Sequence, residues 1–524
     1  MASTALYTSI KKKILILLIL PIVFLPYTVF ASNVGESLTI GMQSTKTLTI
    51  RPLDPQERDM LSVYNIVYES LFYIDDDYKP QGLLAESWDI SSNGKTWTIK
   101  LRDNVTFSDG TPLTANDVVY TMNAILDRAN DENSASPGFY SNLKYYVTSV
   151  SPSSDNTIVI KVKRPSYAFF YELLFPVLKA SEIYSDSPVG TGPYVISNFV
   201  AGDYMQLEVN QNWWKLRPRT KSIMISFSNI AKDVLDDYEY ARVDTAFSRS
   251  IAAAQYKSGT NAISMTYRTN QLECLLMNNN SNELTSNARE AIRHTVDVDK
   301  LISSFYSGMA LRTYTPMYPG NWTYNDGLAG YFNKDLNEAS RLLAEDGWED
   351  SDENGVLDKI GSKGTLVNFH LRFYVYEEPD NDVRVNVANT IADQLAEIGI
   401  ECKVETMSMA QIKEKLAAGS YDLALVSYAM DPAPDPGFLL MRKNTGNYAR
   451  YSSAQMDELH NTLRKTTDFA EYQSLLMEIQ KLFVKDNPFL CLYYRTGSVL
   501  SRYMYTTVRD VREYELLRGI ENMN

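Results

Sequence analysis

The feature that most constrains the fold of this chain is the stretch 84–126, LAESWDISSNGKTWTIKLRDNVTFSDGTPLTANDVVYTMNAIL, in which several local structural signals follow one another without interruption. Apolar and polar residues alternate along 96–101, the period of a half-buried strand. Residues 92–94, Ser-Asn-Gly, predict the turn before it. Further on, Thr114 and Asp117 resemble an acidic variant of the capping box that begins a helix. The stretch therefore predicts a strand, a hairpin, a second strand and a capped helix, an order that would also suit a generic α/β fragment.

The sequence words AESW and GKTWTIKLRDNVTFSDGTPLTANDVVY together resemble the signature block of the family 5 extracellular solute-binding proteins of ABC importers, the oligopeptide, dipeptide and nickel type. Residues 190–214, from GTGPY to LEVNQNWW, resemble the return strand pair of that family. Residues 287–302 predict two helices that meet at Asp297, which can cap the second, and they resemble a helical segment of the family. The resemblance covers essentially the whole mature chain, in order. It implies an α/β fold with two lobes, periplasmic-binding-protein-like (type II, cluster C), with an extra small α/β domain in the first lobe.

A chain of 524 residues is too long for one hydrophobic core and indicates several domains. The resemblance implies that the second lobe contributes most of the ligand contacts. The expected division is a signal peptide or uncleaved anchor, 1–31; the first part of lobe I, 32–77; the small domain, 78–184; the second part of lobe I, 185–268; lobe II, 269–491; and a C-terminal return to lobe I, 492–524.

The N-terminus has the pattern of an export signal. Three lysines, at 11–13, precede an apolar run over 14–30, and small residues at 29 and 31 suit a signal peptidase. We expect cleavage after Ala31 and an exported protein, periplasmic or associated with the cell surface. The alternative is an uncleaved anchor, although Pro21 and Pro26 would kink it. No cysteine lies near Ala31, unlike the lipoprotein members of the family, so the sequence leaves open how the protein is retained near a membrane.

Charge and cysteine content exclude several classes of partner. The formal net charge of -14 argues against nucleic acid or anionic lipid, because no basic stripe is present to neutralise phosphates. Cys274, Cys402 and Cys491 are an odd number of cysteines in an exported chain, so at least one thiol is unpaired. We expect all three to be small buried hydrophobic residues rather than a disulfide framework.

Motifs of catalysis are mostly missing from the sequence. No G-x-S-x-G, H-E-x-x-H, P-loop or C-x-x-C occurs. His294, His370 and His460 are far apart, so a histidine cluster could form only through folding. The chain is therefore expected to be a binding protein and not an enzyme, with a secreted hydrolase as the alternative from another class.

One segment has the spacing of a metal loop. Position 6 of an EF-hand-type loop is Gly355, but position 12, which should be glutamate, is Gly361, and a strand rather than a helix is expected to follow. The sequence thus leaves two interpretations, a structural Ca²⁺ site or a solvated acidic turn, and predicts no other cofactor. Positions 1, 3, 5 and 9 are occupied by Asp350, Asp352, Asn354 and Asp358.

Asp431 is the main candidate for a ligand contact. It follows the apolar strand 423–430 and precedes Pro432, so it lies where a strand ends and the chain turns. The resemblance implies that an aspartate here receives the α-ammonium of a peptide. A cationic amine taken out of water into a cleft also needs a fixed carboxylate partner. Asp435 is the rival, and the resemblance assigns it to capping the next helix.

The resemblance implies a function as well as a fold. Two lobes would close on a small peptide, and the closed form would deliver it to the transmembrane subunits of an ABC permease. A nickel chelate or an oligosaccharide is the alternative solute, and a monomer is expected.

For the ligand carboxylate an arginine is expected, because its planar fork matches two oxygens. The candidates for that contact are Arg372 and Arg384, and those for lining the cleft are Tyr428 and Trp322.

Overall fold

The computed structural model describes residues 35–523, apart from 46–47, 56, 134–135, 259–262, 362–363 and 379–380. The predicted signal segment, 1–31, lies outside these residues. Within the described ranges, the structure contains no helix that is both long and apolar enough to cross a membrane.

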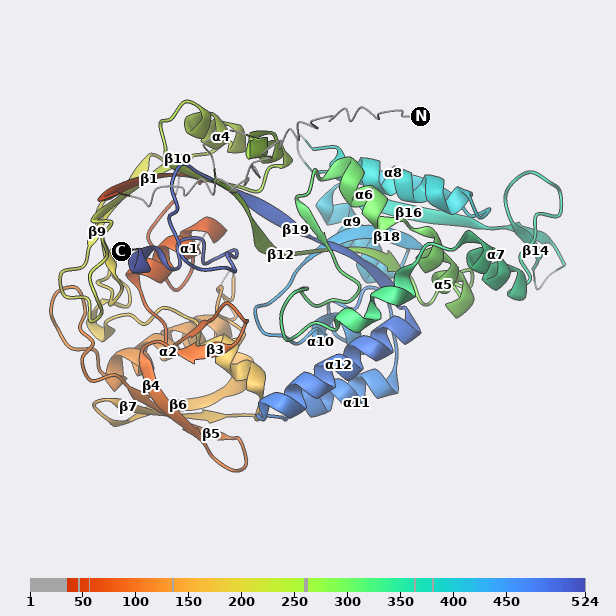
Figure 1. The fold of residues 1–524 in the computed structure, drawn as a ribbon. Helices are drawn as coiled ribbons and strands as arrows, with labels where there is room; N and C mark the ends of the chain where they lie inside the picture. Colours follow the sequence, from red (N-terminus) through yellow and green to blue (C-terminus); the bar gives the residue numbers. More distant parts are fainter. Residues whose placement is uncertain are drawn as a thin grey trace, which may run out of the picture.

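A single mixed sheet runs through both lobes (Figure 1), in the order β17-β16-β18-β12-β19-β11-β1-β10-β9-β8 with β13 paired to β19. Parallel and antiparallel pairs coexist, as in other large α/β sheets. Its strands are β1 (Ser37–Gln43), β8 (Tyr194–Val200), β9 (Tyr204–Val209), β10 (Ser222–Ser228), β11 (Thr245–Ser248), β12 (Ile263–Met277), β13 (Ala310–Arg312), β16 (His370–Tyr376), β17 (Glu401–Met407), β18 (Leu423–Ala429) and β19 (Phe489–Ser501).

The two long strands β12 and β19 connect the lobes and pair with each other along most of their length. Their register shifts between Arg268 and Leu272, where the regular pairing is interrupted. The expected lobe boundaries, 268/269 and 491/492, fall within these two strands, so both lobes share them. Because an interrupted ladder bends more easily than a regular one, this position is suited to act as a hinge.

The small domain is formed around the stretch that opened the sequence argument. Its sheet has the order β4-β5-β7-β6, and Trp97, Ile99 and Leu101 of β5 are fully buried, as the alternation predicts. The expected capping box is present, since the Thr114 amide donates to the Asp117 carboxylate at 2.8 Å. The elements are β4 (Ala85–Ile90), β5 (Thr96–Leu101), α2 (Ala115–Asn130), α3 (Leu143–Tyr146), β6 (Val147–Ser154), β7 (Thr157–Val162) and the 3₁₀ helix η1 (Tyr167–Leu173).

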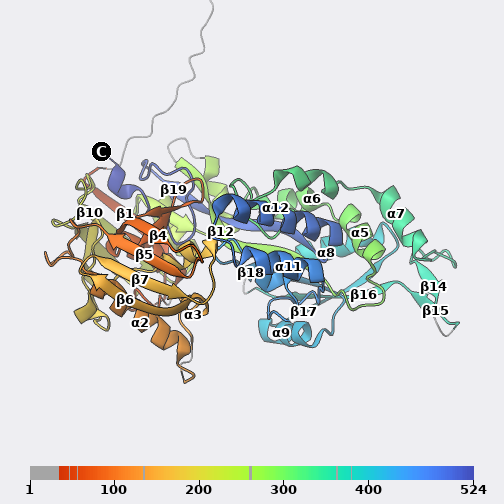
Figure 2. The same ribbon diagram turned by 90° about the horizontal axis from the view of Figure 1, so that it is seen from below.

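Lobe II is covered by helices on both faces of its part of the sheet (Figure 2). Asp297 caps its helix as expected, accepting from the Lys300 amide at 3.0 Å. The helices of this lobe are α5 (Ser286–Thr295), α6 (Val298–Phe305), α7 (Leu336–Glu345), α8 (Val383–Ala396), α9 (Met409–Ala418), α10 (Gly437–Leu440), α11 (Ala454–Leu463) and α12 (Phe469–Asp486), with the 3₁₀ helix η4 (Asp326–Phe332).

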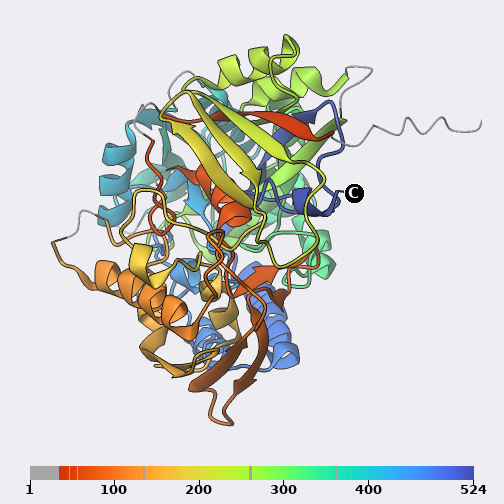
Figure 3. The same cartoon turned by 90° about the vertical axis from the view of Figure 1, so that its left-hand side faces the viewer.

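Lobe I consists of one end of the sheet with helices beside it, above the small domain in Figure 3. Two small hairpins complete the chain, one beside the cleft between the lobes and one at the far end of lobe II. These elements are α1 (Arg58–Val67), α4 (Ala231–Glu239), the 3₁₀ helices η2 (Ala180–Glu182), η3 (Ile251–Ser258) and η5 (Ile520–Asn522), the hairpin β2 (Phe72–Ile74) with β3 (Pro80–Gly82), and the hairpin β14 (Asp358–Ile360) with β15 (Leu366–Asn368).

The small domain also packs directly against lobe II. Tyr167 of η1 lies 5.3 Å from Tyr472 and 5.5 Å from Phe469 between ring centroids, and its amide donates to the Thr466 carbonyl. In Figures 1 and 2, α11 and α12 extend from lobe II towards the small domain. Aromatic residues in this segment join the two bodies. From the sequence, the aromatic and apolar run 165–178 predicts a helix packed under the sheet of the small domain.

Buried cysteines were predicted correctly at two positions of three. Cys274 and Cys491 are buried and face each other in the β12–β19 register, while Cys402 on β17 is half-buried. All three are free thiols.

Candidate functional site

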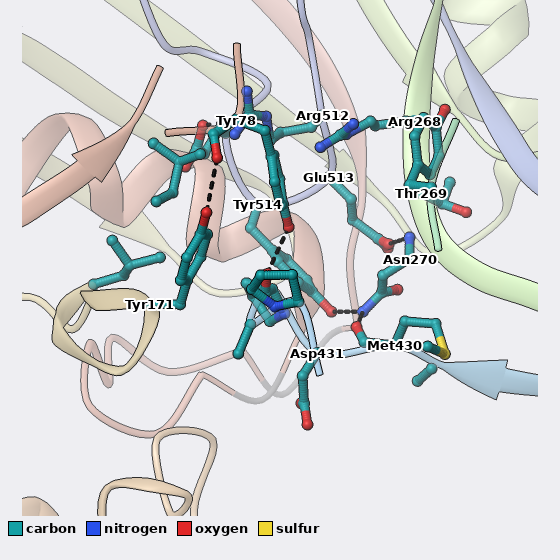
Figure 4. A pocket seen from close by; sticks show the side chains of 18 of the residues that line it. Tyr78, Tyr171, Arg268, Thr269, Asn270, Met430, Asp431, Arg512, Glu513 and Tyr514 are labelled. Carbon is teal, nitrogen blue, oxygen red and sulfur yellow. Dashed lines mark hydrogen bonds and ion pairs between the residues drawn. The ribbon is translucent and has the colours of Figure 1, made fainter. Parts of the chain in front are cut away.

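A cavity of about 480 Å³ lies where the lobes and the small domain meet. Its wall is formed by α1, by loops of the small domain, by the interrupted part of β12, by the turn after β18 and by a segment near the C-terminus, residues 512–515. A pocket at a domain interface, beyond the end of a strand, is a common position for a ligand site. Figure 4 shows part of this lining at close range.

Asp431 lies in this wall, directly after β18 as the sequence predicts. Its carboxylate accepts one hydrogen bond, at 3.3 Å, from the side chain of Asn142 in the small domain. Asp431 is exposed at the cavity wall, yet the surrounding protein removes part of the hydration of its carboxylate. This desolvation raises the pKa of Asp431, and the charge of Asp435 acts in the same direction. Within the described part of the chain, Asp431 forms no ion pair with a cation.

Asp435 has a structural role in the same turn. It accepts from the Gly437 amide at 2.9 Å, which begins α10, and pairs with His460 at 3.1 Å and with Arg464 at 2.5 Å. Its bonds to His460 and Arg464 outweigh burial and hold its pKa well below the usual range. Of the two acids in the proline-rich turn, Asp431 is therefore the one whose charge remains available to a ligand.

The opposite part of the cavity contains two arginines together with the acids that pair with them. The guanidinium of Arg268 lies between two tyrosine rings, 4.4 Å from the centroid of Tyr78 and 4.3 Å from that of Tyr318. Its ion pair with Asp510 is long, at 3.6 Å. Arg512 lies beside it and donates to the Asp510 carboxylate at 2.6 Å. In Figure 4 the two arginines lie at one edge of the lining and Asp431 at the other, so guanidinium groups and an unpaired carboxylate lie at opposite ends of the cavity.

Tyr78 connects the hairpin β2–β3 to lobe II. Its hydroxyl donates to the Pro432 carbonyl at 2.7 Å, and its own carbonyl accepts from Tyr171 at 2.7 Å and from the Trp322 indole at 2.8 Å. Tyr78 has φ of +64°, a conformation that favours glycine, so the turn is held by these contacts. The structure therefore has the lobes in contact around the cavity.

Asn270 occupies the interrupted part of β12 and joins three segments. Its side-chain amide donates to the Met430 carbonyl at 3.0 Å and to the Tyr514 hydroxyl at 2.9 Å. Its backbone amide donates to Glu513 at 3.1 Å. The side-chain oxygen is buried without a partner among the described residues, which leaves an acceptor beside the cavity for a ligand N–H.

The two arginines that the sequence offered for the ligand carboxylate lie outside this wall. Arg384 is buried and makes a bidentate ion pair with Glu273, at 2.5 and 2.8 Å, and a further contact with Glu378 at 2.8 Å. Arg372 lies on β16 and pairs with Asp422 at 2.9 Å, half-exposed on lobe II. Both guanidiniums already have carboxylate partners within the protein.

The two aromatic candidates lie behind the wall. Tyr428 donates its hydroxyl to the Gly446 carbonyl at 3.0 Å and contacts the ring of Phe438, which itself lines the cavity. Trp322 donates to Tyr78 and packs on Phe469 at 4.9 Å. Each side chain supports a lining residue and does not itself face the cavity.

Sequence reasoning missed Arg268, Arg512 and Glu172 as lining residues. Glu172 is a single charge within the apolar run 165–178, and a lone charge in such a run is a usable signal of a special environment. No comparable local signal marks Arg268 or Arg512. Residues of the stretch 84–126 do not line this cavity among the described residues, although other parts of the small domain do.

The acidic loop precedes β14 at the far end of lobe II. One oxygen each from Asp350, Asp352 and Asp358 lie within 4.8 Å of one another, as a cation site requires. Asn354 donates its amide to Asp350 at 3.0 Å, and Asp358 accepts from Ser351. The loop is thus closed by its own hydrogen bonds, and calcium binding there stays a prediction.

A second cavity of about 650 Å³ lies beside the first, between lobe I and the small domain. The two share Asn65, Leu174 and Glu515 as lining residues. Glu69 lies in its wall and accepts from the indoles of Trp213 and Trp214, at 3.3 and 2.8 Å. Together the cavities provide more room than a small ion or a single amino acid requires.

Comparison with known proteins defines the class to which this fold and cavity belong. Residues 79–450 match the model of the bacterial extracellular solute-binding proteins, family 5. This chain therefore belongs to the family 5 extracellular solute-binding proteins.

Among individual relatives, the chain is similar to the oligopeptide-binding protein AppA of Bacillus subtilis, with 24% identity over 511 residues, which cover 92% of this chain and 91% of that protein. The solved structure of the Bacillus subtilis AppA in complex with a nonapeptide has a TM-score of 0.66 at 21% identity and covers 94% and 99% of the two chains. NikA from Brucella suis, in complex with Fe(III)-EDTA, has a TM-score of 0.77 at 19% identity over 93% and 99%. These likenesses confirm the two-lobed α/β fold predicted from the sequence.

Proposed function

We propose that this protein is the exported solute-binding component of an ABC importer and that it captures peptides between its two lobes. The observation that carries this proposal is the placement of Asp431 at one end of the cavity and of the guanidinium groups of Arg268 and Arg512 at the other. A peptide with free termini has an ammonium at one end and a carboxylate at the other, so the two charge distributions are complementary. The similarity to the oligopeptide-binding AppA supports the same ligand class.

The wall also suits an extended main chain. Asn270 offers an unpaired acceptor, and the guanidinium of Arg268, which lies between two tyrosine rings, offers donors. Backbone contacts of this kind are independent of side chains, and adjoining space filled with water admits different side chains. The second cavity beside the first provides such space.

Closure would follow from contacts to both lobes. A ligand that binds Asp431 in lobe II and Arg268 or Arg512 at the lobe I side stabilises the closed state, because the open state cannot offer both contacts at once. In this proposal the closed, monomeric protein then docks on the transmembrane subunits of a permease. The peptide is released there intact, since the protein acts by binding and not by catalysis.

The test replaces Asp431 by alanine. Asp431→Ala removes the partner of the α-ammonium, so affinity for a free-amine peptide should fall by about tenfold or more, while affinity for the N-acetylated peptide changes little. Isothermal titration calorimetry with both peptides measures the difference, and mass spectrometry of the peptide after incubation should show it uncleaved.

Asp393→Ala is the matched control, because Asp393 is an exposed aspartate of the same lobe, on α8 and outside the cavity. It should bind both peptides like the wild type. An equal loss for free and blocked peptides in Asp431→Ala would refute the role of Asp431. Absence of peptide binding by the wild type, with binding of a metal chelate, would favour the solute class of the NikA likeness instead.

A further inference from the structure

A second carboxylate of the cavity wall comes from the small domain. Glu172 belongs to η1 and lines the same cavity, partly buried. Within the described residues its carboxylate has neither a hydrogen bond nor an ion pair, whereas most other acids around the cavity have a cation close by. An acid without a partner in a ligand cavity needs its counter-charge from elsewhere.

Among the described residues no cation pairs with Glu172. Burial and, to a smaller extent, the charge of Asp431, which lines the same cavity from the turn after β18, raise the pKa of Glu172 to about 8. Asp435, in the same turn as Asp431, is already neutralised by Arg464 and His460. Tyr171, next to Glu172 in η1, stays protonated, because burial raises its pKa well above the usual value.

The cations of the cavity are engaged elsewhere. Arg58 pairs with Glu513 at 3.5 Å, Arg268 with Asp510, and Arg512 with Asp510 and, at 3.8 Å, Glu515. In the small-domain loop that faces the turn, the neutral amide of Asn142 is the group that reaches Asp431. A positive charge at this end of the cavity must therefore come from the ligand.

We propose that Glu172 and Asp431 together form a two-carboxylate site for the cationic end of the ligand, which makes Glu172 a specificity-determining residue contributed by the small domain. This inference rests on the proposed function of peptide capture. The site is built from two bodies, because η1 belongs to the small domain and Asp431 to lobe II. The site therefore stabilises the closed state only when a cation is bound in it.

The same arrangement lowers the affinity for a ligand whose end is neutral. Two ionised carboxylates in one cavity repel each other, so closure over a blocked N-terminus requires one of them to take up a proton. A cationic end removes that requirement, since it compensates both charges. Binding of a neutral-ended peptide should accordingly strengthen as the pH falls, while binding of a free-amine peptide should not.

The experiment measures the affinities of Glu172→Gln and the wild type, by calorimetry at pH 7.5 and pH 5.5, for a free-amine peptide and its N-acetylated form. At pH 7.5 the substitution should lower the affinity for the free-amine peptide by about tenfold and raise the affinity for the acetylated peptide by about three- to tenfold. In the wild type the acetylated peptide should bind more tightly at pH 5.5 than at pH 7.5, and Glu172→Gln should remove this dependence.

Opposite effects on the two peptides are the decisive result, because a substitution that only loosened the fold would weaken both. Glu132→Gln is the matched control, an exposed glutamate of the same domain outside the cavity, and should behave like the wild type. Effects of the same sign on both peptides, or an unchanged pH dependence, would overturn the role of Glu172 and leave peptide capture standing. If the wild type binds neither peptide, both the role of Glu172 and the proposal of peptide capture are overturned.

Discussion

At the scale of single residues, the partner of a charged side chain decides its role. Arg384 and Arg372 are both arginines of lobe II, and the sequence offers either for a ligand carboxylate. Arg384 is buried against Glu273, which is 1% exposed in its side chain, whereas Arg372 is 51% exposed in its pair with Asp422. A buried pair has lost its hydration and depends on both partners, while an exposed pair exchanges freely with water.

We therefore expect the two arginines to differ in their effect on stability. Arg384→Met leaves Glu273 buried and without its bidentate partner and should lower the free energy of unfolding by about 3–5 kcal/mol. Arg372→Met should cost at most about 1 kcal/mol. Urea denaturation followed by circular dichroism compares the two, and indistinguishable midpoints would contradict the assignment of Arg384 to a buried structural pair.

At the scale of elements, the acidic loop before β14 tests whether a nearly complete ligand pattern is sufficient for a metal. Three carboxylates converge, but position 12 is Gly361, positions 9 to 11 belong to the strand β14, and the strand β15 follows in place of a helix. The loop is held by its own hydrogen bonds, such as that from the Gly355 amide to Asp350 at 3.0 Å. Without the bidentate glutamate, its affinity should lie in a weak range.

We expect Ca²⁺ to bind this loop with a dissociation constant on the order of 10⁻⁴–10⁻³ M, as in extracellular calcium modules. Calorimetric titration of calcium into chelator-treated protein measures it, and Asp352→Asn should weaken it further by removing a charged ligand. Peptide binding should not change, because the loop is at the far end of lobe II from the cavity. Absence of heat at millimolar calcium would leave the loop a solvated acidic turn.

At the scale of the whole molecule, function depends on how the two lobes, which the long strands β12 and β19 connect, come into contact around the cavity. The hairpin β2–β3 reaches lobe II through the hydroxyl of Tyr78, which donates to the Pro432 carbonyl directly beside Asp431. This bond joins the two sides of the cavity and exists only when they are close. It should therefore contribute to closure and not to the stability of either lobe.

Tyr78→Phe tests this contribution. Loss of one hydrogen bond of about 1 kcal/mol should weaken peptide affinity about fivefold, mainly through faster dissociation, with an unchanged melting temperature of the empty protein. Tyr120→Phe is the control, because Tyr120 is an exposed tyrosine of α2 in the small domain and lines neither cavity. Stopped-flow measurement of peptide release gives the dissociation rate of each variant. A rate for Tyr78→Phe equal to that of the wild type would show that Tyr78 does not stabilise the closed state.

What the sequence by itself determined are the features that depend on neighbours along the chain. Alternation along 96–101, the capping box at Thr114 and the cap at Asp297 were predicted and are present, because backbone hydrogen bonds and burial of one face are local properties. Asp431 was placed correctly at the end of a strand for the same reason. The segment 165–178 was expected to be a helix, but only the 3₁₀ helix η1 forms there, since its aromatic residues pack against lobe II.

Only the tertiary structure decided which charges meet. Arg268, Arg512 and Glu172 come from segments far apart in the chain, and their side chains share one cavity because the lobes, the small domain and the C-terminal segment fold around it. Conversely, Arg384 is not available to the ligand, because it pairs with Glu273, which lies 111 positions away in the sequence. Electrostatic interactions depend on distance in space and on loss of water, neither of which a local sequence pattern records.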